Sequence, residues 1–310
     1  MSEIRTDLAI EAHEMCSKEK AEENKFSGID VAEYEKNGVY VTVIKVKDEK
    51  GAKILSKPIG TYATIEAPDI KFSDEVYQSS CIEISNQIRK LYNITETTKT
   101  LVVGLGNKMI TPDALGPAVV SKLMITNHIK TNMKEYLDDS YSAVCAIIPG
   151  VLGTTGIETL QIIKGVVDRI KPEVVICVDA LAARSMERVS TAFQISDTGI
   201  NPGSGVENKR EGINEETLGV KVIAIGVPTV VDAATIAIDS IEFAASKDKL
   251  TPKNKDCIIR DVLTKNAKNM MVTPKDIDLV IDRCAKTVAN GINMALHRNI
   301  SFKDIESYVG

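Results

Sequence analysis

The chain has 310 residues, of which 44% are hydrophobic, and a formal net charge of −5. This length is enough to bury a sizeable hydrophobic core. The weak negative charge, with no basic run interleaved with aromatic residues, argues against direct binding to nucleic acid. The longest apolar stretches are far shorter than the ~20 residues needed to span a bilayer, so no membrane contact is expected.

The N-terminus has no apolar segment of the kind that a signal peptide needs. The six cysteines form no Cys-x-x-Cys pair. Two of them, Cys145 and Cys177, lie inside apolar runs, where a free thiol behaves as a small hydrophobic side chain. We therefore expect reduced thiols and a cytoplasmic protein.

The first third of the chain predicts a peripheral region. Residues 1–36 are polar and biased towards helix. Residues 38–46 and 59–66 are rich in β-branched side chains and flank a polar turn, which predicts a β-hairpin. A helix is expected over 73–91.

From residue 99 onwards, short apolar runs alternate with helical stretches. This alternation is typical of an α/β fold with a mostly parallel sheet that is covered by helices on both faces. The strands are expected at 99–103, 141–148, 174–178 and 220–225, and the helices at 112–127, 155–170, 230–245 and 273–297, the last beginning with Thr273 as its N-cap.

Several polar residues and glycines follow these strands directly. In sheets of this kind, ligands bind at the carboxyl ends of the strands. Gly106 and Asn107 follow the first strand, and Asp113 lies a few residues further on. Asp179 follows the third strand, and Thr229 follows the fourth. We expect all of them at one edge of the sheet, with Gly106, Asn107 and Thr229 supplying hydrogen bonds to a carbonyl or to the two carboxylates.

Taken singly, each aspartate has a structural explanation. Asp113 follows Thr111-Pro112 and is expected in the first turn of a helix, where an acid complements the helix dipole. Asp179 is suited to capping the next loop or helix. Brought close together, however, two carboxylates cannot both ionise easily, so one keeps its proton. A charged base beside a neutral acid can activate water and protonate a leaving amine.

Other hydrolytic chemistries have weaker support in the sequence. The three histidines, His13, His128 and His297, form no His-Glu-x-x-His zinc motif. There is no Gly-x-Ser-x-Gly elbow and no phosphate-binding loop. Two carboxylates could still hold a hard metal ion, so a metal-dependent peptidase that uses the same acids stays open as an alternative. A protein that binds its target without cutting it is a second alternative.

Ordered motifs along nearly the whole chain resemble the germination protease family of spore-forming bacteria. The motifs are Ile4-Arg-Thr-Asp-Leu-Ala9, Leu101-Val-Val-Gly-Leu-Gly-Asn107, Thr111-Pro-Asp-Ala-Leu-Gly-Pro117, Thr155-Gly-Ile-Glu158, Val178-Asp-Ala-Leu-Ala-Ala-Arg184, Gln194-Ile-Ser-Asp-Thr-Gly-Ile200, Asn201-Pro-Gly-Ser-Gly205, Ile225-Gly-Val-Pro-Thr-Val-Val-Asp-Ala233 and Met271-Val-Thr-Pro-Lys275.

The resemblance implies an aspartate-dependent endopeptidase that cleaves small acid-soluble spore proteins during germination, in the spore core. It assigns the catalytic roles to Asp113 and Asp179 and implies no cofactor. It also implies a homotetramer and a three-layer α/β/α fold similar to that of the hydrogenase-maturation peptidases.

The resemblance further implies a zymogen that removes its own N-terminal propeptide. Cleavage is expected between Asp7 and Leu8, giving a propeptide of residues 1–7 and a single peptidase domain of residues 8–310. The family cuts after an acid that precedes an apolar residue and alanine, as in Asp7-Leu8-Ala9. The polar loop 195–210 is expected to form a wall or clamp for substrate, although Glu207 stands where the family commonly has glycine.

Overall fold

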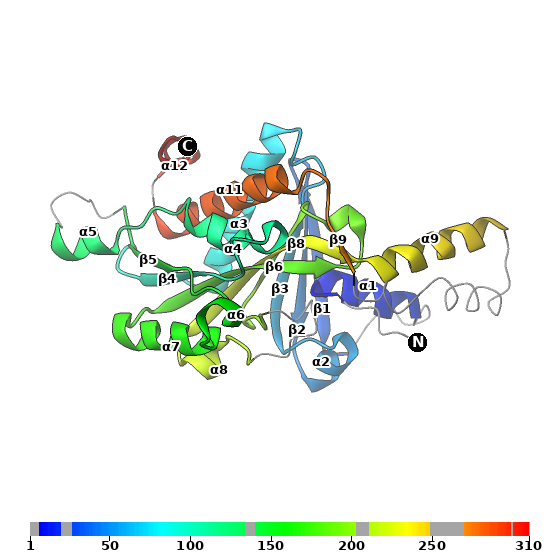
Figure 1. The fold of residues 1–310 in the computed structure, drawn as a ribbon, viewed down its shortest axis with the longest axis horizontal. Coiled ribbons are helices and arrows are strands. Elements are labelled where there is room, and N and C mark those ends of the chain that lie inside the picture. Colours follow the sequence, from blue (N-terminus) through cyan, green and yellow to red (C-terminus); the bar gives the residue numbers. More distant parts are fainter. Residues whose placement is uncertain are drawn as a thin grey trace.

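The computed structural model describes residues 6–19, 27–133, 140–202, 211–248, 270–298 and 300–309. Within these ranges the strands form one nine-stranded sheet, which runs through the middle of Figure 1. The strands are β1 (Ile29–Lys36), β2 (Val39–Val46), β3 (Gly60–Glu66), β4 (Lys99–Gly104), β5 (Ala143–Ile147), β6 (Val174–Ala183), β7 (Ala192–Ser196), β8 (Lys221–Asp232) and β9 (Met271–Val272).

The sheet is mixed rather than mostly parallel. Its order is β1-β2-β3-β7-β8-β6-β4-β5, with β9 paired to β8. The pairs β8-β6, β6-β4 and β4-β5 are parallel, as the sequence predicts for this part of the chain. The pairs from β1 to β8 and the β8-β9 pair are antiparallel. The expected hairpin is therefore not peripheral, because β3 pairs with β7 and joins β1 and β2 to the central sheet.

Helices pack on both faces of the sheet (Figure 1). One face holds the largest hydrophobic cluster, which includes side chains of α3 (Asp74–Leu91), α4 (Leu115–Val120) and α11 (Ile277–Leu296). On the other face, α7 (Thr159–Ile170) and α1 (Ala9–Glu19) contribute to two separate clusters. The remaining helices of the described ranges are α2 (Glu49–Leu55), α5 (Asn127–Asn132), α6 (Leu152–Thr155), α8 (Glu215–Leu218), α9 (Ala233–Asp248), α12 (Phe302–Val309) and the short 3₁₀ turns η1 (Thr111–Asp113) and η3 (Met186–Arg188).

The sequence predicted the bounds of some helices correctly and those of others wrongly. Helix α3 begins as expected, because the Ser73 hydroxyl accepts a hydrogen bond from the Val76 N–H at 3.2 Å. The last long helix begins at Ile277, so the predicted cap at Thr273 is wrong. The Thr273 hydroxyl instead donates to the Thr229 carbonyl at 2.9 Å. The single helix expected over 112–127 is divided into η1, α4 and the start of α5.

Strands β6 and β8 are longer than the sequence predicts. They pair beyond the end of β4, as far as Ala183 and Val231, with a register shift after Leu181. Leu181 and Val231 belong to the hydrophobic cluster that α1 covers, and this burial stabilises the extension. Asp179 therefore lies inside β6 rather than after it.

Candidate active site

The loop after β4 folds back onto Asp113. The Asn107 N–H donates to the Asp113 Oδ2 at 2.8 Å and to the Asp113 main-chain oxygen at 3.0 Å. Gly106 has a φ of +102°, and a Cβ at this position would lie 2.1 Å from the Asp113 carbonyl oxygen. The predicted proximity of Gly106, Asn107 and Asp113 is thus present. Asp113 itself ends the 3₁₀ turn η1 instead of lying in the first turn of an α-helix.

Thr229, in β8, binds the η1 turn that contains Asp113. Its side chain is 1% exposed, and its hydroxyl donates to the Pro112 carbonyl at 2.7 Å. The turn also packs against β6 and β8. The sequence suggested that Thr229 would bind a carboxylate or a substrate carbonyl. In this structure the hydroxyl holds the backbone next to Asp113, and its contact with a carboxylate or a substrate carbonyl stays a prediction.

Asp179 is buried in β6, with 6% of its surface exposed. Its Oδ1 accepts a hydrogen bond from the Ala180 N–H at 2.9 Å. The preceding residue, Val178, accepts from the Leu105 N–H at 2.8 Å, which ties β6 to the start of the Gly106 loop. Burial raises the pKa of the Cys177 thiol, and the negative charge of Asp179 raises it further. Residues 177 and 179 share a face of the sheet, because the side chains of a strand alternate between its two faces.

The N-terminal segment lies against the far end of the same strand. The Asp7 N–H donates to the Ala182 carbonyl at 3.1 Å, and the Ala182 N–H donates to the Asp7 Oδ2 at 2.9 Å. Leu8 and Ala9 are fully buried in the cluster under α1. The carboxylate of Glu11 accepts from the Arg184 N–H at 2.7 Å, in the turn that follows β6. The segment is therefore a packed part of the fold.

A cavity of about 140 Å³ adjoins this segment, and its walls include Asp7, Lys57, Leu181, Gln194 and Gly226. Sequence reasoning missed Lys57 and Gln194 as site residues. Lys57 precedes β3 and Gln194 lies in β7, and only the antiparallel half of the sheet brings them into the same cavity wall as Leu181 of β6. Burial lowers the pKa of Lys57, although the negative charges of Asp7 and Glu11 oppose that shift.

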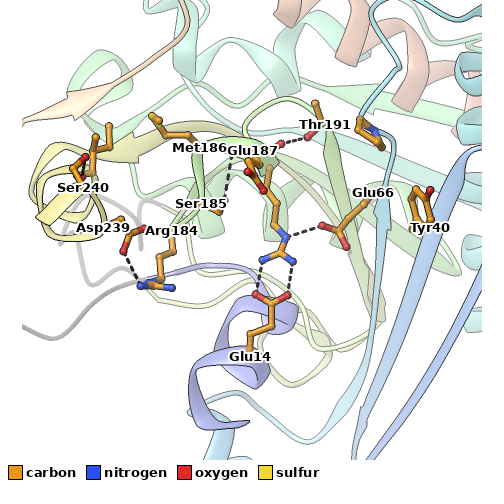
Figure 2. Close-up of a pocket in the computed structure, with 13 residues that line it drawn as sticks. Glu14, Tyr40, Glu66, Arg184, Ser185, Met186, Glu187, Thr191, Asp239 and Ser240 are labelled. Carbon is orange, nitrogen blue, oxygen red and sulfur yellow. Dashed lines mark hydrogen bonds and ion pairs between the residues drawn. The ribbon is translucent and has the colours of Figure 1, made fainter. Parts of the chain in front are cut away.

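A larger cavity, of about 1010 Å³, lies beside α1 and the turn after β6 (Figure 2). Several of its charged side chains are paired with one another. Arg188 contacts Glu14 at 2.5 Å and Glu66 at 2.7 Å, and Arg184 contacts Asp239 at 2.8 Å. Because these pairs join α1 to β3 and to η3, we assign the cavity walls a role in holding the N-terminal region in place.

The structure also bears on the cysteines, on a metal site, on a membrane span and on the expected substrate loop. Of the six cysteines, the five in the described ranges are free, and Cys257 lies outside those ranges. In the described part of the chain, no three His, Cys, Asp or Glu residues are grouped to hold a metal ion. No helix of these same ranges is long and apolar enough to cross a membrane. Residues 203–210 of the expected substrate loop, with Glu207, are outside the described ranges, and residues 192–196 form β7.

Comparison with known proteins identifies the class and then the family. The family model described as "Germination protease" matches residues 9–248 and 247–309, which makes the chain a protease. The chain is 45% identical to the germination protease of Clostridium tetani, over 99% of both chains, and 44% identical to that of Caldanaerobacter subterraneus subsp. tengcongensis, over 97% of both. It is 39% identical to the Bacillus licheniformis germination protease, over 96% of this chain and 94% of the relative. The chain belongs to the germination protease family.

Proposed function

We propose that this member of the germination protease family is an endopeptidase that begins the breakdown of small acid-soluble spore proteins in the spore core. It is made as a zymogen that removes residues 1–7 itself, and its catalytic water is activated by Asp113 and Asp179. In the same proposal, residues 8–310 form one three-layer peptidase domain similar to the hydrogenase-maturation peptidases. The domain acts as a homotetramer and needs no cofactor, nucleic acid or membrane.

One observation carries this proposal best. The Asp7-Leu8 peptide, an acid followed by a buried apolar residue and alanine, is bound to the strand that contains Asp179. The N–H and the carboxylate of Asp7 both bond to Ala182, three positions along β6 from Asp179. A substrate-like sequence bound to the strand that carries a candidate catalytic acid is what a self-processing protease requires.

The chemistry follows from two acids in different settings. One carboxylate, unprotonated, takes a proton from water as the water oxygen attacks the peptide carbonyl carbon. The other, protonated, gives its proton to the leaving nitrogen as the C–N bond breaks. The products are a new carboxylate on the acidic residue and a new amine on the apolar residue. Such a pair titrates jointly, so neither role is assigned to one aspartate alone.

The test replaces each acid by its amide in the full-length chain. Asp113→Asn and Asp179→Asn should each slow the cutting of a purified acid-soluble spore protein by about 10²–10⁴-fold, because each removes one proton-transfer group. Release of residues 1–7, followed by intact mass, should slow in parallel. Asp168→Asn, an exposed acid on α7, is the matched control and should behave as the wild type.

The outcomes separate the three candidate functions. Wild-type rates in both amide variants would reject the aspartate mechanism. Loss of activity after exhaustive chelation, restored by a divalent metal, would favour a metal-dependent peptidase that uses the same acids. Tight binding of the spore protein with no cutting by the wild-type chain would favour a binding protein.

A further inference from the structure

The carbonyl group of Asp7 is held by two side-chain donors. Lys57 Nζ contacts it at 2.9 Å and Gln194 Nε2 at 3.2 Å. The other end of the Gln194 amide, Oε1, accepts from the Ala9 N–H at 2.6 Å. One glutamine side chain thus binds the backbone on both sides of Leu8, and it fixes the Asp7-Leu8 peptide bond between its two contacts.

This peptide bond lies over a row of residues that leads to Asp179. Gln194 on β7 pairs with Gly226 on β8, and Gly226 pairs with Asp179 on β6. Paired residues of neighbouring strands project to the same face, and two strand spacings put the Cα atoms of Gln194 and Asp179 about 10 Å apart. The residue between them is Gly226, which has no side chain on that face of the sheet.

The packing shows that Asp179 lies on the face of the sheet that α1 covers. Leu181, two residues after Asp179, packs in the same cluster as Leu8. Leu181 also lies over the position that a Gly226 side chain would take, 2.3 Å from its Cβ. The Asp7 carbonyl, the Gln194 amide and the Asp179 side chain are therefore on one side of the sheet.

We propose that Lys57 and Gln194 form the carbonyl-binding site for cleavage of the Asp7-Leu8 bond. This inference rests on the proposed function, because it assumes that the bond is cut. When the water oxygen adds to the Asp7 carbonyl carbon, the carbonyl oxygen gains the negative charge. Two donors already aimed at that oxygen stabilise the charge. Collapse of the intermediate breaks the C–N bond, with a proton passing to the Leu8 nitrogen.

The Gln194 amide has a second function in this arrangement. Its contact with the Ala9 N–H fixes the register of the chain, so that the Asp7 carbonyl lies 2.9 Å from Lys57 Nζ, which also donates to the Thr6 carbonyl at 3.3 Å. Leu8 sits fully buried between the two contacts. An acid at residue 7 also has a partner at this site, since the Asp7 carboxylate accepts from the Ala182 N–H.

The test follows release of residues 1–7 from full-length chains by intact mass, under conditions in which the wild-type chain releases them. Lys57→Met should slow release by about 10²-fold or more, as removal of a donor from an oxyanion site does. Gln194→Glu keeps an acceptor for the Ala9 N–H but replaces the donor to Asp7 with a charged oxygen, and it should slow release to a similar extent. Lys57→Arg should release the segment faster than Lys57→Met.

Two controls keep the result specific. Lys53→Met removes an exposed lysine on the neighbouring helix α2 and should leave the rate unchanged. Melting temperatures of all variants show whether a slow variant is folded. If Lys57→Met does not fold, the release rates of Gln194→Glu and Lys57→Arg test the carbonyl-binding site.

The outcomes also distinguish the two levels of the proposal. If Asp179→Asn blocks release while folded Lys57→Met and Gln194→Glu release the segment at the wild-type rate, the carbonyl site is wrong and the aspartate mechanism stands. If Asp113→Asn and Asp179→Asn release it normally, the proposed function fails. A wild-type chain that never releases the segment overturns both.

Discussion

Replacement of Gly106 by alanine tests whether the position of Asp113 matters. Gly106 has a φ of +102°, which side chains rarely adopt. Its missing Cβ would lie 2.1 Å from the Asp113 carbonyl oxygen and 2.9 Å from Oδ1, whereas real Cβ contacts essentially never fall below 3.0 Å. The added methyl group must therefore displace either the Gly106 loop or Asp113 by about 1 Å.

Two effects of different size follow from this displacement. The backbone strain should lower the free energy of unfolding by about 1–3 kcal/mol. A shift of about 1 Å in a catalytic group should lower the cleavage rate by about 10²-fold. The loss of activity should therefore exceed what the unfolded fraction alone explains, because a protein destabilised by this amount is still mostly folded.

The assay combines urea unfolding with cleavage of a peptide that carries residues 3–12 of the chain. Gly165→Ala is the matched control. Gly165 lies within α7, with open space around the position of its Cβ, so alanine there should stabilise the protein by up to about 1 kcal/mol and leave cleavage unchanged. A Gly106→Ala protein that cleaves the peptide at the wild-type rate would refute the reasoning, since Asp113 would then tolerate the displacement.

Other substitutions test the supports around the site. Thr229→Val removes the hydroxyl that bonds to the Pro112 carbonyl and should cost about 1 kcal/mol in urea unfolding, and an unchanged stability would contradict that bond. Arg188→Met removes the ion pairs with Glu14 and Glu66 and should lower the free energy of unfolding by about 2–4 kcal/mol. A gain in stability would contradict the prediction. Burial lowers the pKa of His297 to about 4 from 6.5, so stability present above pH 6.5 is lost as the pH falls towards 4. The free energy of unfolding should drop by about 2 kcal/mol between pH 7 and pH 5. That drop should be absent in His297→Gln, and an identical pH dependence in both proteins would count against it.

The sequence alone determined the parts of the molecule that depend on local pattern. The apolar runs that became β4, β5, β6 and β8 identified the parallel core, because a strand buried on both faces needs continuous hydrophobic residues. Helix α3 was expected over 73–91 and spans Asp74–Leu91. The motifs that resemble the germination proteases indicated the family, and comparison over the whole chain confirmed it.

Only the tertiary structure decided how far the central strands run and what their neighbours contribute. Where β6 ends depends on its partner β8 and on α1, which are distant in sequence, so the apolar run could not show that Asp179 lies inside the strand. Strand β7 was missed because its five residues lie next to a Gly-rich polar segment. Lys57 and Gln194 carry no local signal of function, since a lysine in a turn and a glutamine in a strand are ordinary. They meet at the Asp7 carbonyl because β3, β7, β8 and β6 are neighbours, and strand pairing between distant segments is set by the packing of the whole sheet.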